Sequence, residues 1–414
     1  MKLPRDLFQP HRLPLAMLFL VGVWLRVANV GNVAVRTPDE HVYTHQAAVW
    51  LHSGASGIRS LVDRYEHDPD ARNYPTPTRV GVIRLVALTM QLTGRHDETA
   101  GAIVSCLASI GSLAVIAFLA ARFLPPFGAL FALLFYAVSP VELAISRRLW
   151  PDAILELLGI LLVWIAAEIT AGARRMTWLA AFAAAGSVGL AVKESFPVTY
   201  GLCGIWVLWV LAVRGRDGKR TLLLAGFCLA GMAAAVAWLA ASVGSLSELA
   251  RIASHVPAAN AANTYALAYA SGPPWLLLEA FWIVSPAMAL FAAAGFFAAF
   301  LRSRELEHGS VVAGIAAFTA VHLAIMMAMP HFLNLRYVSM LFGPLYLVAG
   351  LGFWWVLRWS ARLLAATDRR LATAMAAALV IGLAIGDYLR FERFFVRDNT
   401  ADLSVRMLQD EKNR

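Results

Sequence analysis

Charged residues are scarce in this sequence. Asp, Glu, Lys and Arg make up 15% of the 414 residues, and hydrophobic residues make up 60%. Typical soluble domains contain about 25% charged residues. A soluble fold cannot bury such an apolar excess, so the composition predicts a chain whose solvent is lipid. The same composition excludes disordered and collagen-like proteins.

Cysteine is also rare. Cys106, Cys203 and Cys228 lie in apolar runs without C-x-x-C spacing, and we interpret them as small core residues rather than disulfide partners or metal ligands. The net charge is +9, but the sequence has no zinc-finger spacing, helix-turn-helix pattern or Arg-rich tail. We therefore expect no nucleic-acid partner, and interpret the basic residues as a signal of membrane topology.

Apolar stretches near the length of a bilayer recur along the chain. We predict an all-α integral membrane protein that forms a single membrane domain over residues 1–414, with about eleven transmembrane helices. The first apolar run follows a basic start like that of a signal peptide, but Arg26 interrupts it, so we expect an uncleaved anchor. The expected spans are 13–30, 100–121, 126–141, 152–170, 178–192, 197–213, 221–243, 278–301, 310–329, 337–357 and 371–388.

Lys and Arg residues set the predicted orientation. With a cytoplasmic N-terminus, sixteen of them fall in inner segments and five in short outer loops, as the positive-inside rule requires. We expect a multi-pass protein of the plasma (inner) membrane with its C-terminus outside. Two outer segments are long, 31–99 and 244–277, and the short outer tail 389–414 is too small to fold alone.

Amphipathic stretches occur in the first long outer segment. Residues 39–52 place apolar and histidine side chains on separate helical stripes, and residues 79–93 form an apolar run with two arginines. We expect both to be helices that lie along the membrane surface.

Ionisable residues gather on one side of this predicted topology. Charge near a membrane is costly and marks function by default, so the gathering predicts an active site at the outer surface. Its members are Arg26, Asp39, Glu40, Arg147, Arg148, Asp152, Glu156, Lys193, Glu194, His331 and Arg336.

Five motifs within these segments resemble those of a known superfamily, in the same order. They are T-P-D-E-H-V-Y at 37–43, Y-P-T-P-T at 74–78, S-R-R-L-W-P-D at 146–152, L-A-V-K-E-S at 190–195 and L-R-Y-V-S-M-L-F-G-P-L at 335–345. The sequence is similar here to GT-C glycosyltransferases, which include protein O-mannosyltransferases and the lipid A aminoarabinose transferase. It departs from them in having Pro75-Thr76-Pro77 where the family has Pro-Pro. We also expect no C-terminal soluble domain of the kind that is common in the superfamily.

The resemblance implies the GT-C fold and a reaction. A sugar on a polyprenyl phosphate would pass, with inversion, to a lipid, glycan or protein acceptor on the outer face, among membrane lipids and without a cofactor. Asp39, with Glu40 beside it, would supply the catalytic carboxylate that takes the acceptor proton. Arg148, Lys193, Arg336 and Tyr337 would bind the donor phosphate, and Tyr43, Arg147, Asp152, Glu156 and His331 would bind substrate.

Structural interpretations stand beside these roles. Asp39 could cap a helix over 40–52, Glu40 could complement its N-terminus, and Asp152 could cap the helix after Pro151. Asp152 and Glu156 share a helical face and would repel each other unless a cation or a proton lies between them, and Arg147 or Arg148 could be that cation.

Other interpretations remain for the basic residues. Lys193 could extend to the interface, and Arg336 could be a charge at the end of a span. His41 and His45 have the spacing of a zinc pair, but lack the glutamate directly after the first histidine that a zinc hydrolase needs, and no third ligand is evident. A divalent metal site is therefore not favoured.

Two other classes of function compete with a transferase. A transporter or flippase of a lipid-linked sugar or other anionic substrate would have many helices with charge at the midplane and an inverted repeat, and we find no such repeat. The second is a non-catalytic membrane scaffold, which would not need carboxylates and cations aligned on one face. An outer cavity with Asp39 at its floor favours the transferase, and a midplane cavity favours transport.

Overall fold

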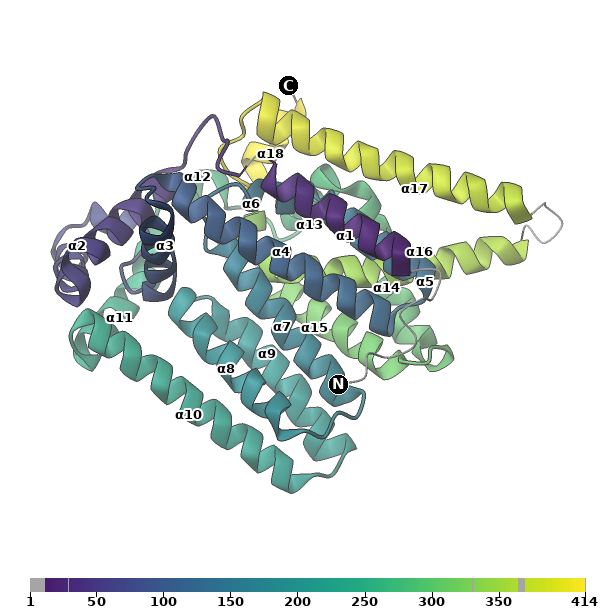
Figure 1. Ribbon diagram of the computed structural model, residues 1–414, viewed down its shortest axis with the longest axis horizontal. Helices are drawn as coiled ribbons and strands as arrows, with labels where there is room; N and C mark the ends of the chain where they lie inside the picture. Colours follow the sequence, from purple (N-terminus) through teal and green to yellow (C-terminus); the bar gives the residue numbers. More distant parts are fainter. Residues whose placement is uncertain (1–11, 29, 330, 364–368, 414) are drawn as a thin grey trace.

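The computed structural model describes all residues except 1–11, 29, 330, 364–368 and 414, and within that part of the chain every regular element is helical (Figure 1). The predicted all-α membrane architecture is confirmed. Nine helical segments there are long and apolar enough to cross a membrane, and Leu13–Val27 and Met176–Val192 are shorter apolar helices. These segments correspond to the eleven expected spans. Residues 1–11, which we expect in the cytoplasm, lie outside the described residues.

The helices follow one another with few long interruptions. They are α1 Arg12–Val27, α2 Pro38–His67, α3 Val80–Thr93, α4 Glu98–Phe123, α5 Pro126–Ala137, α6 Pro140–Ile145, α7 Asp152–Thr170, α8 Met176–Val192, α9 Phe196–Trp209, α10 Gly218–Val243, α11 Leu246–Ala262, α12 Thr264–Tyr269, α13 Leu276–Val284, α14 Pro286–Arg302, α15 Gly309–Ala328, α16 Phe342–Leu363, α17 Arg369–Phe391 and α18 Val405–Asn413.

Prolines divide two of the expected spans. The span expected at 126–141 ends as α5, and Pro140 begins the separate helix α6. The span expected at 278–301 is likewise divided, because Pro286 begins α14. Proline lacks an N–H and clashes with the preceding turn, but it is favoured in the first turn of a helix. The serine before each proline accepts a hydrogen bond from a backbone amide three residues later, which completes the cap.

The two amphipathic stretches of the first outer segment are helical, as expected. α2 begins at Pro38 and continues well past residue 52, with a kink at Gly54, where φ is 57°. Glycine adopts this left-handed conformation without steric cost. α3 matches the stretch expected at 79–93 to within one residue.

Close helix packing holds the centre of the bundle together. α16 packs between α14 and α5, and small residues line both contacts. A methyl group on Gly295 of α14 would overlap the carbonyl oxygen of Val348 of α16, and Gly128 of α5 faces Gly350 equally closely. Small residues permit such approach of helix backbones in membranes.

The segments at one end of the bundle are joined to one another. Figure 1 shows α2, α3 and α11 grouped at this end, beside the helices that cross the bundle. The backbone after α15 bonds to the segment before α18, with Leu335 N donating to Leu403 O at 3.0 Å and Val405 N to Leu333 O at 3.2 Å. α18 packs on α13. Segments distant in sequence therefore meet here.

Candidate active site

Arg336 is the centre of an ion-pair network at this end of the bundle. It lies in a 3₁₀ turn, Leu335–Leu341, between α15 and α16. Its Nη2 donates to Asp39 Oδ2 at 3.1 Å, its Nε to Asp152 Oδ2 at 3.2 Å and its Nη1 to Asp402 Oδ1 at 3.2 Å. Trp150 lies under the guanidinium, 4.2 Å from the ring centroid. One cation thus joins three carboxylates from separate parts of the chain.

Helix starts place two of these carboxylates. Asp39 follows Pro38 in the first turn of α2, and Asp152 is the first residue of α7 after Pro151. The partial positive charge of a helix N-terminus favours an acidic residue there. Neither side chain is an N-cap: Thr37 caps α2, and the Asp152 side chain makes no cap bond. The capping interpretations of Asp39 and Asp152 are therefore wrong.

Lys193 completes the network. It ends α8, and its Nζ donates to Asp152 Oδ1 at 2.9 Å. The Tyr337 ring lies 4.8 Å from Nζ. Burial lowers the pKa of the Lys193 ammonium, and Asp152 opposes that shift. The cations paired with Asp152 are thus Lys193 and Arg336, not Arg147 or Arg148 as expected.

Asp39 differs from the other members of the network in exposure. Its side chain is 32% exposed, against 0% for Asp152 and 6% each for Asp402 and Arg336. The network holds three carboxylates and two cations, so the negative charge is not fully neutralised. Asp39 is the carboxylate that solvent or substrate can reach.

Glu40 lies in a separate, buried pair. Its carboxylate accepts from Arg148 at 2.9 Å, from Arg36 at 2.7 Å and from the backbone amides of Leu149 and Thr37 at 3.1 and 2.9 Å. Burial would raise the pKa of this carboxyl, but Arg148 and the other donors together lower it. Glu40 thus forms ion pairs with both arginines, and its bonds to Arg148 and Leu149 join α2 to the segment before α7.

A small pocket opens beside Lys193. Its volume is about 110 Å³, and its polar wall consists of Thr78, Arg79, Lys193 and Glu194. Leu239 of α10 and Leu249 and Ile252 of α11 form part of the apolar wall. Asp39 does not line this pocket, so it is not the outer cavity with Asp39 at its floor that would favour a transferase.

Arg79 connects this pocket to α2. Its Nε donates to Glu194 Oε2 at 2.9 Å, and its guanidinium also donates to the hydroxyl of Tyr43. Burial would raise the pKa of the Glu194 carboxyl, but Arg79 lowers it. Burial raises the pKa of the Tyr43 hydroxyl, so this group stays protonated. Tyr43 is fully buried, which leaves its hydroxyl to position Arg79.

Five of the expected residues lie away from the network. Glu156 is buried one turn deeper, where its Oε1 and Glu142 Oε2 lie 2.8 and 3.0 Å from the Tyr136 hydroxyl oxygen, whose single proton can serve one of them. The Arg147 guanidinium lies over Phe391, 4.5 Å from the ring centroid. His331 and His41 bond through Nδ1 to Ser271 Oγ at 2.6 Å and Glu98 Oε1 at 2.7 Å. His45 is exposed. The described residues contain no group of three or more His, Cys, Asp or Glu side chains that could hold a metal ion.

Three residues of the site were not expected from the sequence. They are Arg79, Asp402 and Tyr265, whose hydroxyl donates to Asp402. Asp402 lies in the tail that follows α17, and Asn334 Nδ2 donates to its Oδ2 at 3.0 Å. The predicted topology could have pointed to Asp402 and Tyr265, because it places the tail and the segment 244–277 on the same side of the membrane as Asp39.

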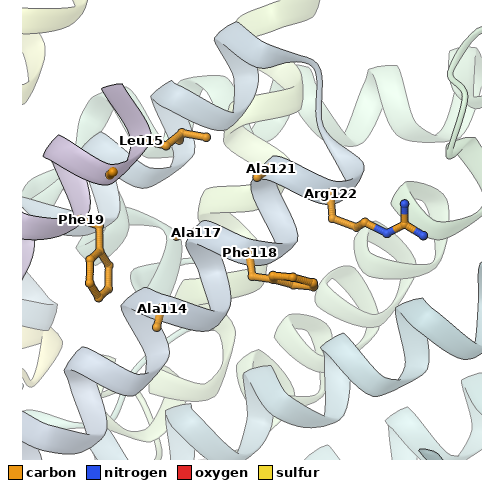
Figure 2. A pocket seen from close by; sticks show the side chains of 8 residues that line it. Leu15, Phe19, Ala114, Ala117, Phe118, Ala121 and Arg122 are labelled. Carbon is orange, nitrogen blue, oxygen red and sulfur yellow. The ribbon is translucent and has the colours of Figure 1, made fainter. Parts of the chain in front are cut away.

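A larger hollow lies elsewhere. Its volume is about 550 Å³, and its lining includes Leu15 and Phe19 of α1 and Ala114, Phe118 and Arg122 of α4. Figure 2 shows these side chains. The wall of this hollow is apolar apart from Arg122, and no residue of the ion-pair network lines it. We therefore do not include it in the candidate active site.

The fold and these motifs define a class, the GT-C membrane glycosyltransferases, to which the chain is similar. Residues 82–238 match the family model of dolichyl-phosphate-mannose-protein mannosyltransferases. A comparison with curated protein sequences gives no match. The resemblance inferred from the motifs is thus confirmed for the fold.

Two solved structures illustrate the likeness. One is ArnT from Cupriavidus metallidurans bound to undecaprenyl phosphate, with a TM-score of 0.62 and 14% identity over 96% of this chain and 77% of that one. The other is the oligosaccharyltransferase AglB from Archaeoglobus fulgidus, in complex with an inhibitory peptide and a dolichol-phosphate. Its TM-score is 0.57 and its identity 12%, over 95% of this chain and 56% of that one.

Proposed function

We propose that the protein is an inverting glycosyltransferase that moves a sugar from a polyprenyl-phosphate donor to a hydroxyl-bearing acceptor at the outer face of the plasma membrane. The observation that carries the proposal is the ion-pair network, in which Asp39 alone is substantially exposed. The adjoining pocket combines basic side chains with an apolar wall, which suits a phosphate on a hydrocarbon chain.

Lys193 and Arg79 contact the donor phosphate in this proposal. Both line the pocket, whereas Arg148 has a side chain only 3% exposed and is paired with Glu40. The prenyl chain would lie along Leu239, Leu249 and Ile252. ArnT with undecaprenyl phosphate and AglB with dolichol-phosphate support this donor class, because both share the fold.

Asp39 is the general base. The acceptor oxygen attacks the anomeric carbon, the bond from that carbon to the phosphate oxygen breaks, and Asp39 takes the acceptor proton. Only one oxygen of Asp39, Oδ2, accepts from Arg336, which leaves the other for the acceptor hydroxyl. A positioned base of this kind contributes about 10²–10⁴-fold to a rate.

The cations stabilise the leaving group. The phosphate diester carries one negative charge, and the polyprenyl phosphate that departs approaches two. Lys193 and Arg79 are already fixed by Asp152 and Glu194, so they meet this charge without reorganisation, and they bind the transition state more strongly than the ground state. Arg336 acts by holding Asp39 in place.

Turnover of defined donors tests the proposal. We would incubate the purified protein with a panel of labelled polyprenyl-phosphate sugars and acceptors, with and without a chelator, beside Asp39→Asn. We expect transfer of at least one sugar by the wild type with release of polyprenyl phosphate. If the protein instead carries intact donor between leaflets of a vesicle and transfers no sugar, it is a flippase and the proposal is wrong.

A further inference from the structure

Arg84 of α3 lies between helices from three parts of the chain. Its guanidinium carbon is 4.2 Å from the centroid of the Trp50 ring on α2 and 4.6 Å from that of the Trp238 ring on α10. Stacking on indole rings fixes the plane of a guanidinium while leaving N–H groups at its edge. The side chain is partly buried, so its edge can be reached from outside.

The charge of Arg84 is not compensated by any described residue. Arg79, on the turn before α3, is paired with Glu194, but no ion pair formed within the described part of the chain includes Arg84. Among the described residues its guanidinium donates to Ser242 Oγ at 3.4 Å, and the Nε atom is buried there without a hydrogen-bond partner. Arginine carries five N–H donors, so most of the hydrogen-bonding capacity of Arg84 is unused.

The surroundings of Arg84 match the boundary between headgroups and acyl chains. Leu85, Leu88 and Leu92 on α3 are 39%, 49% and 77% exposed and form one stripe beside it. An exposed apolar stripe on a surface helix enters the bilayer, and tryptophans concentrate at the level of the headgroups. A phosphate oxyanion at that level would meet the free edge of the guanidinium.

We propose that Arg84, held by Trp50 and Trp238, binds the phosphate of a membrane glycerophospholipid whose acyl chains lie along the leucine stripe of α3. The planar guanidinium can donate two parallel hydrogen bonds to the oxygens of a phosphate. None of these three residues lines the donor pocket, although Trp238 packs against the buried cluster that contains Leu239 of the pocket wall. The inference holds whether or not the protein transfers sugar.

Lipid retention measured by native mass spectrometry tests this site. The purified full chain in neutral detergent would be titrated with phosphatidylglycerol as the probe, alongside Arg84→Gln, Trp238→Phe and the control Arg95→Gln. Arg95 lies just after α3, is exposed and pairs with Asp97. We expect one tightly held lipid in the wild type and in Arg95→Gln, and about tenfold weaker retention in Arg84→Gln, since hydrogen bonds to charged groups are the strong ones.

Three results would overturn the proposal. One is equal lipid retention by the wild type and Arg84→Gln, which would make Arg84 a structural link between helices. Another is displacement of phosphatidylglycerol by polyprenyl phosphate, which would assign the site to the donor. The third applies if Arg84→Gln does not fold. The variant Trp238→Phe keeps the Arg84 cation but changes the ring against which it stacks, and unchanged lipid retention in that variant would contradict the proposed phosphate site.

Discussion

Asp39 and Glu40 are adjacent in the sequence but have opposite surroundings. Glu40 is fully buried and accepts from two arginines and two backbone amides, while Asp39 is 32% exposed and, among the described residues, accepts from Arg336. A carboxylate that is fully bonded stabilises the fold, whereas one with a free oxygen can accept a proton. Both residues are acidic, so their residue type does not distinguish the two roles. The burial and the hydrogen bonds of each carboxylate do.

We expect Asp39→Asn to lower the turnover of a polyprenyl-phosphate sugar by about 10²–10⁴-fold without lowering the melting temperature. The amide oxygen can still accept from Arg336, but it cannot take a proton at neutral pH. Steady-state turnover and a thermal melt measure the two effects. Glu40→Gln is the comparison: it removes the charge that compensates Arg148, so we expect its melting temperature to fall. Near-normal turnover of Asp39→Asn would contradict the assignment of the base.

The pH dependence of donor binding reports on Lys193. Burial lowers the pKa of its ammonium group from the ordinary value of 10.5. The charged form binds phosphate, so donor affinity is complete below the lowered pKa and declines as the pH rises through it. We expect KM for the donor to increase on the alkaline side in the wild type. In Lys193→Arg, whose side chain stays charged, KM should remain flat with pH. A wild-type KM that is also flat up to pH 10.5 would show that Lys193 does not contact the phosphate.

The tail after α17 contributes Asp402 to the ion-pair network. Asp402 accepts from Arg336, Asn334 and Tyr265, and its Oδ1 also accepts from the amide of Leu403 at 2.8 Å. These bonds connect the tail, the turn that carries Arg336 and the start of α12. Arg336 can hold Asp39 in one place only if it is itself fixed by its other partners.

We expect Asp402→Asn to lower kcat by up to about 10²-fold, as small misplacements of reacting groups do, while KM for the donor stays close to the wild-type value. Asp402→Glu should recover part of the rate, because it restores the charge. Asp410→Asn, an exposed acidic residue on α18, is the matched control and should behave as wild type. A change in KM without a change in kcat would place Asp402 in donor binding instead.

The sequence predicts the helices better than it predicts their partners. Bilayer-length apolar runs define the spans, and α7 begins at Asp152 and ends at Thr170 as expected. The sequence also locates Asp39 and Asp152 at the starts of helices. The partner of Asp152, in contrast, depends on how α8 and the turn before α16 pack together. No local sequence pattern shows how these segments pack. The sequence therefore pointed to the neighbouring Arg147 and Arg148 as cations for Asp152, whereas Lys193 and Arg336 pair with it.

The orientation of the whole molecule can be tested by thiol labelling. Cys106 and Cys203 are buried and Cys228 is partly buried, and all three would be replaced by alanine. In that background we expect a cysteine at Ser60, exposed on α2, to react with a membrane-impermeant reagent added from outside. A cysteine at Lys219, near the start of α10, should react only after the membrane is opened. The reverse pattern would place Asp39 in the cytoplasm.

The ion-pair network also constrains how the protein is made. Asp39 and Arg336 are 297 residues apart, so a growing chain inserts Asp39, and then Asp152, into the membrane region long before their common cation is synthesised. Until the turn before α16 arrives, Asp39 lacks its cationic partner and must remain hydrated or protonated at the lipid boundary, whereas Asp152 can already pair with Lys193. Contacts so distant along the chain form late. The ion-pair network is therefore completed late in assembly, because Arg336 joins carboxylates that were synthesised long before it.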